Sequence, residues 1–222
     1  MPGRRPTPHK VPPPTIVLLV RHGRTPTTGT ILPGRARGLH LSEGGQAQAE
    51  AVAERIGALA GTPDSPVAVY ASPLERTRET ARPIAERLSV PVTSDKGLIE
   101  CDFGQWTGGD LKKLAKLPEW QTIQRFPSAF RFPGGESFPE MQARMVGALS
   151  RLAAAHAGKA IVCVSHADTI KAAVAAAAGV PLDLFQRLTV SPCSVTALAY
   201  SPTGAHVLCV NSTGSLTDLA LS

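Results

Sequence analysis

The chain carries three short runs of nearly uninterrupted apolar residues, at positions 16–20, 67–71 and 161–165. A strand with one exposed face alternates apolar and polar side chains, whereas a strand covered on both faces does not need to alternate. The three runs therefore predict central parallel strands of an α/β sheet, with helices packed on both of its faces.

The segments between these runs show helical spacing and helix-start signals. Ser42 predicts the cap of a helix that runs to about Leu59. Ser137 and Glu140 have the spacing of a capping box, and they predict the start of a long helix that ends near His156. Further helices are predicted at 74–88 and 169–178, and directly after Pro181.

The remaining strand signals belong at the edges of the sheet. A short run at 90–93 predicts an edge strand, and the runs at 195–200 and 206–210 predict a hairpin around a Pro-Thr-Gly turn. The predicted fold is a three-layer α/β/α sandwich with a mainly parallel central sheet and an antiparallel edge.

The 222 residues fit one domain with two unusual segments. Residues 1–14 contain six prolines and little to bury, so we expect a disordered tail, with a docking role as the alternative. Residues 15–222 form the predicted domain. Within it, 108–135 breaks the alternation of strands and helices. This segment is either an insertion that packs its aromatic residues on the domain or a lid over the site.

Charge and cysteine usage exclude several classes of protein. Of the net charge of +6, +3 comes from Arg4, Arg5 and Lys10. No basic stripe with stacking aromatics follows, so we expect no nucleic-acid partner. No apolar run reaches the roughly 18 residues of a membrane span, and the first run is too short for a signal peptide. Four scattered cysteines predict reduced thiols and a cytoplasmic protein.

Basic side chains follow each of the three apolar runs. Arg21 and His22 come directly after the first run, and His166 comes directly after the third. After the second run, the sequence Ser-Pro-Leu-Glu leads to Arg76. Because the carboxyl ends of parallel strands meet at one edge of a sheet, where ligands bind in open α/β folds, we expect these four side chains to converge.

The residues before Arg76 predict the start of a helix. Ser72 and Glu75 have capping-box spacing and Pro73 suits the first helical position, which places Arg76 in the first turn. Free backbone N–H groups and the positive end of the helix dipole would favour an anion there. Taken alone, His22 is equally well explained as a hydrogen-bonded turn histidine. The recurrence of basic groups at three strand ends favours a phosphate pocket.

These motifs resemble the histidine phosphatase superfamily, also called phosphoglycerate mutase-like, over about residue 16 to the end. The resemblance rests on Arg21-His22-Gly23, Ser72-Pro-Leu-x-Arg76-x-x-x-Thr80-Ala81, Glu100-Cys-Asp-Phe-Gly104, Gly135-Glu136-Ser137 and Ser165-His166. Further blocks at 102–108, 184–187 and 191–194 resemble a bacterial branch that carries a phosphomutase label.

The resemblance implies a role for each of five residues. His22 is the expected nucleophile, because a neutral imidazole is nucleophilic near pH 7 and adjacent arginines disfavour its protonation. Arg21 and Arg76 would grip the phosphoryl oxygens, and a cationic His166 would add a third positive donor. Glu100, which only the resemblance singles out, would protonate the leaving oxygen and then activate water.

The loop at 26–41 borders the pocket in this family. Thr25 and Arg35 are the positions that the resemblance implies as phosphate or substrate contacts. Arg24 stands where the family usually has an acidic residue, and Thr28 stands where asparagine is common. Substrate contacts on this side are therefore expected to differ from the family pattern.

Together these residues predict a metal-independent phosphatase that hydrolyses a small phosphomonoester through a phosphohistidine intermediate. We expect no metal or cofactor, because arginines and histidines supply the positive charge and no Asp/His cluster has metal-ligand spacing. The expected partner is a small phosphorylated substrate, and the protein is expected to be a monomer or a homodimer.

Two alternatives stay open. A phosphomutase shares these residues but must keep water from the phosphohistidine, and only about 27 residues between Gly108 and Gly135 could cover the site. No long basic segment follows the last predicted strand, which also favours hydrolysis. The second alternative is a phospholigand-binding protein without turnover. Ala167 in place of a usual glycine and Thr107-Gly108 in place of a common Glu-Gly favour it.

Overall fold

A computed structural model of the chain describes residues 13–216. The predicted tail at 1–14 therefore lies almost entirely outside the described residues, and its disorder or docking role stays a prediction. Within the described residues, no helix is long and apolar enough to cross a membrane.

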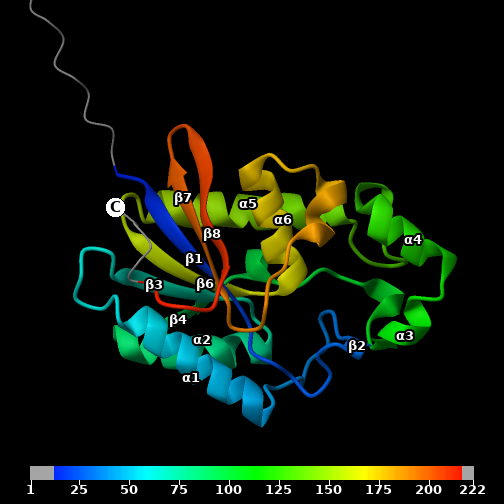
Figure 1. Cartoon of the computed structure of the whole chain (residues 1–222), viewed down its shortest axis with the longest axis horizontal. Coiled ribbons are helices and arrows are strands. Elements are labelled where there is room, and N and C mark those ends of the chain that lie inside the picture. Colours follow the sequence, from blue (N-terminus) through cyan, green and yellow to red (C-terminus); the bar gives the residue numbers. More distant parts are fainter. Residues whose placement is uncertain (1–12, 217–222) are drawn as a thin grey trace, which may run out of the picture.

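A six-stranded sheet forms the centre of the described chain, in the order β4-β3-β6-β1-β7-β8 (Figure 1). Its strands are β1 (Thr15–Arg21), β3 (Pro66–Ala71), β4 (Val92–Ser94), β6 (Ala160–Ser165), β7 (Val195–Ser201) and β8 (Gly204–Ser212). Strands β1, β3, β4 and β6 are parallel to one another, and β7 and β8 continue the sheet antiparallel. The predicted parallel centre and antiparallel edge are both confirmed.

Strand β1 shows why the apolar runs do not alternate with polar residues. Ile16, Leu18 and Val20 pack into a cluster with the helices on one face of the sheet, α1 (Glu43–Gly57) and α2 (Glu75–Leu88). Val17 and Leu19 pack into a second cluster with the helices on the other face, α5 (Phe138–Ala155) and α6 (Ala167–Ala178). Figure 1 shows α1 and α2 below the sheet and α5 and α6 above it. Both faces are therefore core, and the three-layer prediction is confirmed.

The helix starts agree with the predicted caps in two of three cases. Ser42 Oγ accepts a hydrogen bond from Gly45 N at the start of α1, and Ser137 forms the predicted capping box with Glu140 at the start of α5. The capping box predicted from Ser72 is wrong. The cap of α2 is Leu74, whose side chain has no hydrogen-bonding group. The Ser72 hydroxyl lies two residues earlier, where it is bonded to His166 Nε2 at 2.9 Å and, more weakly, to Leu74 N at 3.5 Å.

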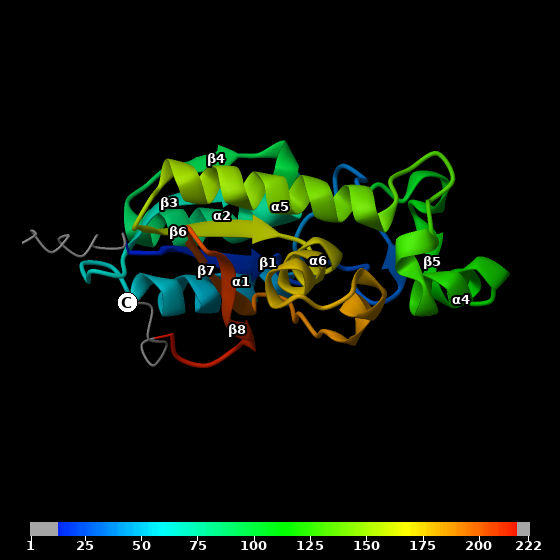
Figure 2. The same cartoon turned by 90° about the horizontal axis from the view of Figure 1, so that it is seen from above.

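The segment between residues 108 and 135 forms an extension beyond the carboxyl ends of β1 and β6 (Figure 2). A small second sheet joins β5 (Gly109–Asp110) to β2 (Ile31–Leu32) in the loop after β1. Two short helices follow, α3 (Leu111–Leu114) and α4 (Pro118–Arg125). Short 3₁₀ turns complete the described elements at Lys96–Leu98, Gly104–Trp106, Pro127–Ala129 and Leu182–Arg187.

Aromatic side chains hold this extension to the domain. They form one buried cluster with edge-on ring contacts, whose aromatic members are Phe103, Trp106, Phe130, Phe132, Phe138 and Phe185. Such ring pairs add about 0.5–1.5 kcal/mol each beyond area burial. The extension therefore has the packing role that the first interpretation predicts, and a lid role stays a prediction.

The start of α1 packs directly against the loop that follows the first motif. A Cβ atom on Gly45 would lie 1.9 Å from Arg24 O, whereas a Cβ on the neighbouring Gly44 would meet nothing within 4 Å. We expect Gly45→Ala to lower the free energy of unfolding by about 1–3 kcal/mol through overpacking. Gly44→Ala, the matched control, should leave it unchanged or raise it by up to about 1 kcal/mol. Urea denaturation checks both variants, and equal stabilities would contradict the observed packing.

Candidate active site

The sheet brings the predicted basic residues together at the carboxyl ends of β1, β3 and β6. Arg21 is the last residue of β1 and pairs in register with Ser165 at the end of β6. The backbone N–H of His22 donates to Ser165 O at 3.0 Å. The rings of His22 and His166 meet edge to face, with centroids 5.2 Å apart. Arg76 reaches the same place from the first turn of α2 and is fully buried.

His22 is held in one tautomer by its own backbone. Its Nδ1 lies 2.7 Å from Gly23 O, and because a carbonyl oxygen only accepts, Nδ1 carries the proton and Nε2 keeps its lone pair. Burial, then the charge of Arg76, with a smaller effect of Arg21, lowers the pKa of His22 to about 3. The imidazole is therefore neutral and nucleophilic across the physiological range.

Two arginines present buried N–H groups without partners among the described residues. Arg21 donates from Nη1 to Val190 O at 2.7 Å, but its Nε has no partner. Arg76 donates from Nη2 to Gly34 O at 2.8 Å, and its Nε and Nη1 have none. A buried donor without a partner costs about 1–3 kcal/mol or more when charged, so these N–H groups favour an anion that can accept from them.

His166 is oriented by hydrogen bonds at both ring nitrogens. Arg76 Nη2 lies 3.4 Å from Nδ1 and can only donate, so Nδ1 accepts and Nε2–H donates to Ser72 Oγ at 2.9 Å. Burial, followed by the positive charge of Arg76, holds the pKa of His166 well below its usual range. The condition under which His166 would add a third positive donor, a cationic imidazole, is therefore not met in the free protein. A neutral imidazole stands beside the two arginines.

Glu100 is the buried acid of the cluster. Its Oε1 accepts from Cys101 N at 2.9 Å, and its Oε2 lies 3.7 Å from His166 Nδ1. Burial, reinforced by the negative charge of Asp168, raises the pKa of Glu100 to about 7. A carboxyl group with this pKa is protonated often enough at neutral pH to donate a proton and can take one back, as a general acid and base must.

Thr25 and Arg35 are placed differently from each other. Thr25 is buried, and its hydroxyl lies 3.0 Å from Thr28 Oγ1, which holds the loop together. Its contact with phosphate stays a prediction. The guanidinium of Arg35 is occupied by Glu100 O, Asp102 and Glu136. All three guanidinium nitrogens of Arg35 have partners, so Arg35 differs from Arg21 and Arg76, which have N–H groups without partners among the described residues.

The sequence analysis assigned no role at the site to three residues that contribute to it. Ser72 orients His166, Gly34 O accepts from Arg76, and Asp168 raises the pKa of Glu100. Asp168 lies in the first turn of α6, two residues after His166, and its carboxylate lies 3.6 Å from Lys171 Nζ. Its position two residues after the candidate His166 was the signal in the sequence that could have identified it.

Among residues 13–216, no group of three or more histidine, cysteine, aspartate or glutamate side chains is arranged to hold a metal ion. The positive charge at the cluster comes from Arg21 and Arg76.

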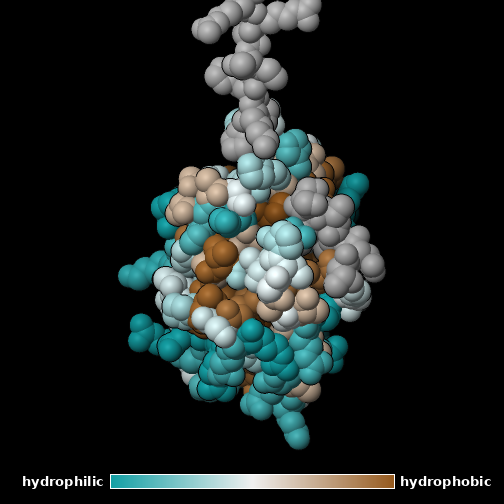
Figure 3. All heavy atoms as spheres, turned by 90° about the vertical axis from the view of Figure 1, so that its left-hand side faces the viewer, coloured by the Kyte–Doolittle hydropathy of each residue, from teal (hydrophilic) through white to brown (hydrophobic). Residues whose placement is uncertain are grey.

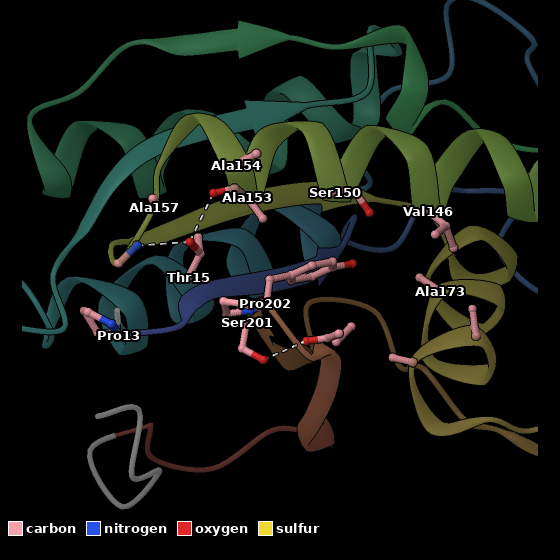
Figure 4. A pocket seen from close by; sticks show the side chains of 16 residues that line it. Pro13, Thr15, Val146, Ser150, Ala153, Ala154, Ala157, Ala173, Ser201 and Pro202 are labelled. Atoms are coloured by element: carbon pink, nitrogen blue, oxygen red, sulfur yellow. Dashed lines mark hydrogen bonds between the residues drawn. The ribbon is translucent and has the colours of Figure 1, made fainter. Parts of the chain in front are cut away.

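A groove of about 590 Å³ lies at the opposite end of β1. Small side chains from α5 and α6 line it, together with Thr15, Tyr200 and the β7–β8 turn (Figure 4). This end of the molecule exposes apolar side chains among hydrophilic ones (Figure 3). Because the lining, drawn from the described residues, contains no charged side chain, the groove is unsuited to phosphate.

Comparison with known proteins supports a relationship across most of the chain. The family model described as histidine phosphatase superfamily (branch 1) matches residues 17–213. Phosphoserine phosphatase 1 of Hydrogenobacter thermophilus is 32% identical over 174 residues, which cover 76% of this chain and 79% of that protein. A probable phosphoglycerate mutase of Klebsiella pneumoniae is 32% identical over 208 residues, covering 91% and 94% of the two chains.

A solved structure shows the same fold. The structure of a mycobacterial glucosyl-3-phosphoglycerate phosphatase superposes with a TM-score of 0.78 at 26% identity and covers 89% of this chain and 99% of its own. The family match spans the cluster of His22, Arg76, Glu100 and His166 as well as the sheet that carries it. The chain therefore belongs to the histidine phosphatase superfamily.

Proposed function

We propose that this protein is a metal-independent phosphatase that hydrolyses small phosphomonoesters through a phosphohistidine at His22. The observation that carries the proposal is the state of His22. Its Nδ1–H is committed to Gly23 O, which leaves Nε2 free, and it is neutral beside arginine N–H groups that have no partner within residues 13–216. Nucleophile and anion donors are thus ready before substrate arrives.

In the first step, Nε2 of His22 attacks phosphorus and the bond to the ester oxygen breaks. Arg21 and Arg76 hold the phosphoryl oxygens, and Glu100 gives its proton to the leaving alkoxide. In the second step, Glu100 takes a proton from water while the water oxygen attacks phosphorus. The N–P bond breaks, inorganic phosphate leaves, and His22 and protonated Glu100 are restored. General acid–base help of this kind contributes about 10²–10⁴ in rate.

The proposal is tested with a generic aryl phosphate in the presence of a chelator and without added metal. Turnover above that of a catalytic-site variant supports a phosphatase, whereas binding of inorganic phosphate without turnover would favour the non-catalytic alternative. Phosphoserine and glucosyl-3-phosphoglycerate, which relatives of this chain are named for, are the first natural esters to test.

Activity on an alkyl phosphate is expected to fall as the pH rises above about 7. The acid form of Glu100 must protonate the leaving oxygen, and its pKa in the free protein is raised to about 7, so kcat/KM declines once this proton is lost. On the acid side, His22 stays neutral down to a pKa of about 3 and imposes no loss near pH 5. A pH profile of kcat/KM checks this. An alkaline decline that persists unchanged in Glu100→Gln would contradict the assignment.

Hydrolysis is expected to exceed isomerisation when the substrate is a phosphoglycerate. A mutase must shield the phosphohistidine from water, and the extension at 108–135 is short and is anchored by its own aromatic cluster. We therefore expect inorganic phosphate to form faster than the isomerised ester. Phosphorus NMR of the products measures both rates, and efficient isomerisation with negligible phosphate release would favour the mutase alternative.

A further inference from the structure

Side chains from three separate segments meet on the backbone that carries Glu100. Arg35, in the loop after β1, donates from Nε to Glu100 O at 2.9 Å. Arg144, in the middle of α5, donates from Nη2 to the same carbonyl oxygen at 3.3 Å. Its Nη1 also donates to Gly97 O and Ile99 O, both at 2.8 Å. Arg35 and Arg144 thus bind carbonyl oxygens of the main chain between Gly97 and Glu100.

Glu136 joins the two arginines. Its Oε2 lies 2.8 Å from Arg35 Nη2 and 3.0 Å from Arg144 Nη2, and its Oε1 accepts from Arg144 Nε at 2.9 Å. Oε2 also accepts from Asp102 N at 3.1 Å, on the other side of Glu100. The pKa of Glu136 is lowered by these arginine contacts against the opposing effect of burial, so the carboxylate stays charged.

The same loop also holds the anion-binding side of the site. Gly34 O accepts from Arg76 Nη2 at 2.8 Å, and the next residue, Arg35, bonds to Glu100 O. Gly34 has a φ of +50°, and a Cβ there would lie 2.9 Å from Thr107 Oγ1 and 3.1 Å from Phe103. The consecutive residues Gly34 and Arg35 therefore connect Arg76 to Glu100. Side chains of Thr107 and Phe103 lie too close to the Gly34 backbone to leave room for a Cβ atom.

We propose that Arg35, Glu136 and Arg144 form an ionic clasp that positions Glu100 for proton transfer to the leaving group. Arg35 and Arg144 act through the Glu100 backbone and are positioning residues. The inference rests on the proposed function, in which Glu100 is the general acid. It replaces the expected phosphate contact of Arg35 with a role in positioning the acid that serves the leaving oxygen.

Leaving-group dependence separates this role from phosphate binding. An alkoxide needs a proton to leave, whereas a nitrophenolate is stable without one, so a misplaced acid slows the phosphorylation step, which kcat/KM reports, only for the alkyl ester. Activation of water by Glu100 comes later and affects kcat on both esters. A displacement of about 1 Å in a catalytic group can cost about 10²-fold in rate. A loss of phosphate binding would instead harm both substrates equally.

The experiment compares Arg35→Ala with Arg37→Ala, an exposed arginine two residues along the same loop. Each variant is assayed on p-nitrophenyl phosphate and on an alkyl phosphate. For Arg35→Ala, we expect kcat/KM to fall by about 10–100-fold on the alkyl ester and by less than about threefold on the aryl ester. Arg37→Ala should match wild type on both. Equal losses of Arg35→Ala on the two esters would overturn the clasp.

Two further measurements distinguish a loss of positioning from a folding defect. Glu136→Gln keeps the shape and removes the charge that joins the arginines, and it should show the same selective loss with a cooperative unfolding transition. Adding Arg35→Ala to Glu100→Gln should cost no more than Glu100→Gln alone, because the acid to be positioned is gone. Additive losses would overturn the proposal. If wild type failed to hydrolyse the aryl ester at all, the proposed function itself would be wrong, which is a distinguishable result.

Discussion

Replacing His22 with alanine is expected to abolish turnover and to leave the fold in place. The variant removes the atom that forms the bond to phosphorus, and loss of a nucleophile costs on the order of 10⁴–10⁶-fold in rate. Among the described residues the side chain makes one hydrogen bond, to its own neighbour Gly23, and an edge contact with His166, so its removal breaks no hydrogen bond between elements. Initial rates and circular dichroism together check both parts.

Chemical trapping gives this prediction a second readout. Wild-type protein quenched during turnover should carry acid-labile, base-stable phosphate, and His22→Ala should carry none. His206→Ala, an exposed histidine on the edge strand β8, is the matched control and should trap phosphate as wild type does. An active His22→Ala protein, or one that still traps phosphate, would remove His22 from the mechanism.

Replacing Arg76 with lysine is expected to lower kcat/KM by about 10²–10³-fold, although the charge is kept. Arg76 is fully buried and uses Nη2 for Gly34 O, while Nε and Nη1 have no partner among the described residues. A lysine ammonium cannot bond to Gly34 O and also present two fixed parallel donors to a phosphoryl group. Steady-state kinetics on an aryl phosphate measures the loss.

The matched control lies two residues away on the same helix. Arg78 is exposed, and Arg78→Lys should keep full activity. Inorganic phosphate should raise the melting temperature of wild type and of Arg78→Lys but have little effect on Arg76→Lys, since a ligand stabilises only what it binds. Wild-type activity in Arg76→Lys would show that the guanidinium fork is not part of the site.

Much of the fold could be predicted because local pattern and burial agree. Ile16 to Val20 are apolar at every position, and in the structure successive side chains face opposite helical layers. The predicted caps at Ser42 and Ser137 are confirmed because each hydroxyl oxygen accepts from the backbone N–H three residues ahead, a partner that the local sequence supplies.

The cap predicted at Ser72 was wrong for the opposite reason. The predicted partner was the nearby Glu75, but the Ser72 hydroxyl bonds instead to His166 Nε2 at 2.9 Å, 94 residues along the chain. The protonation of His166 was also decided at a distance. Burial at the carboxyl end of β6 and the charge of Arg76 lower its pKa. Neither this burial nor the closeness of Arg76 can be read from the residues that flank His166.

Spacing along the chain was enough to predict the parallel strands, the helices between them and the basic residues at the strand ends. How those residues act depends on contacts that form only when the chain folds. The tertiary structure placed Arg35 on Glu100 O, brought Asp168 close enough to raise the pKa of Glu100, and left two N–H groups of Arg76 without a partner in the part of the chain that the structure describes. Electrostatic strength depends on distance and burial, which are fixed when separate segments meet.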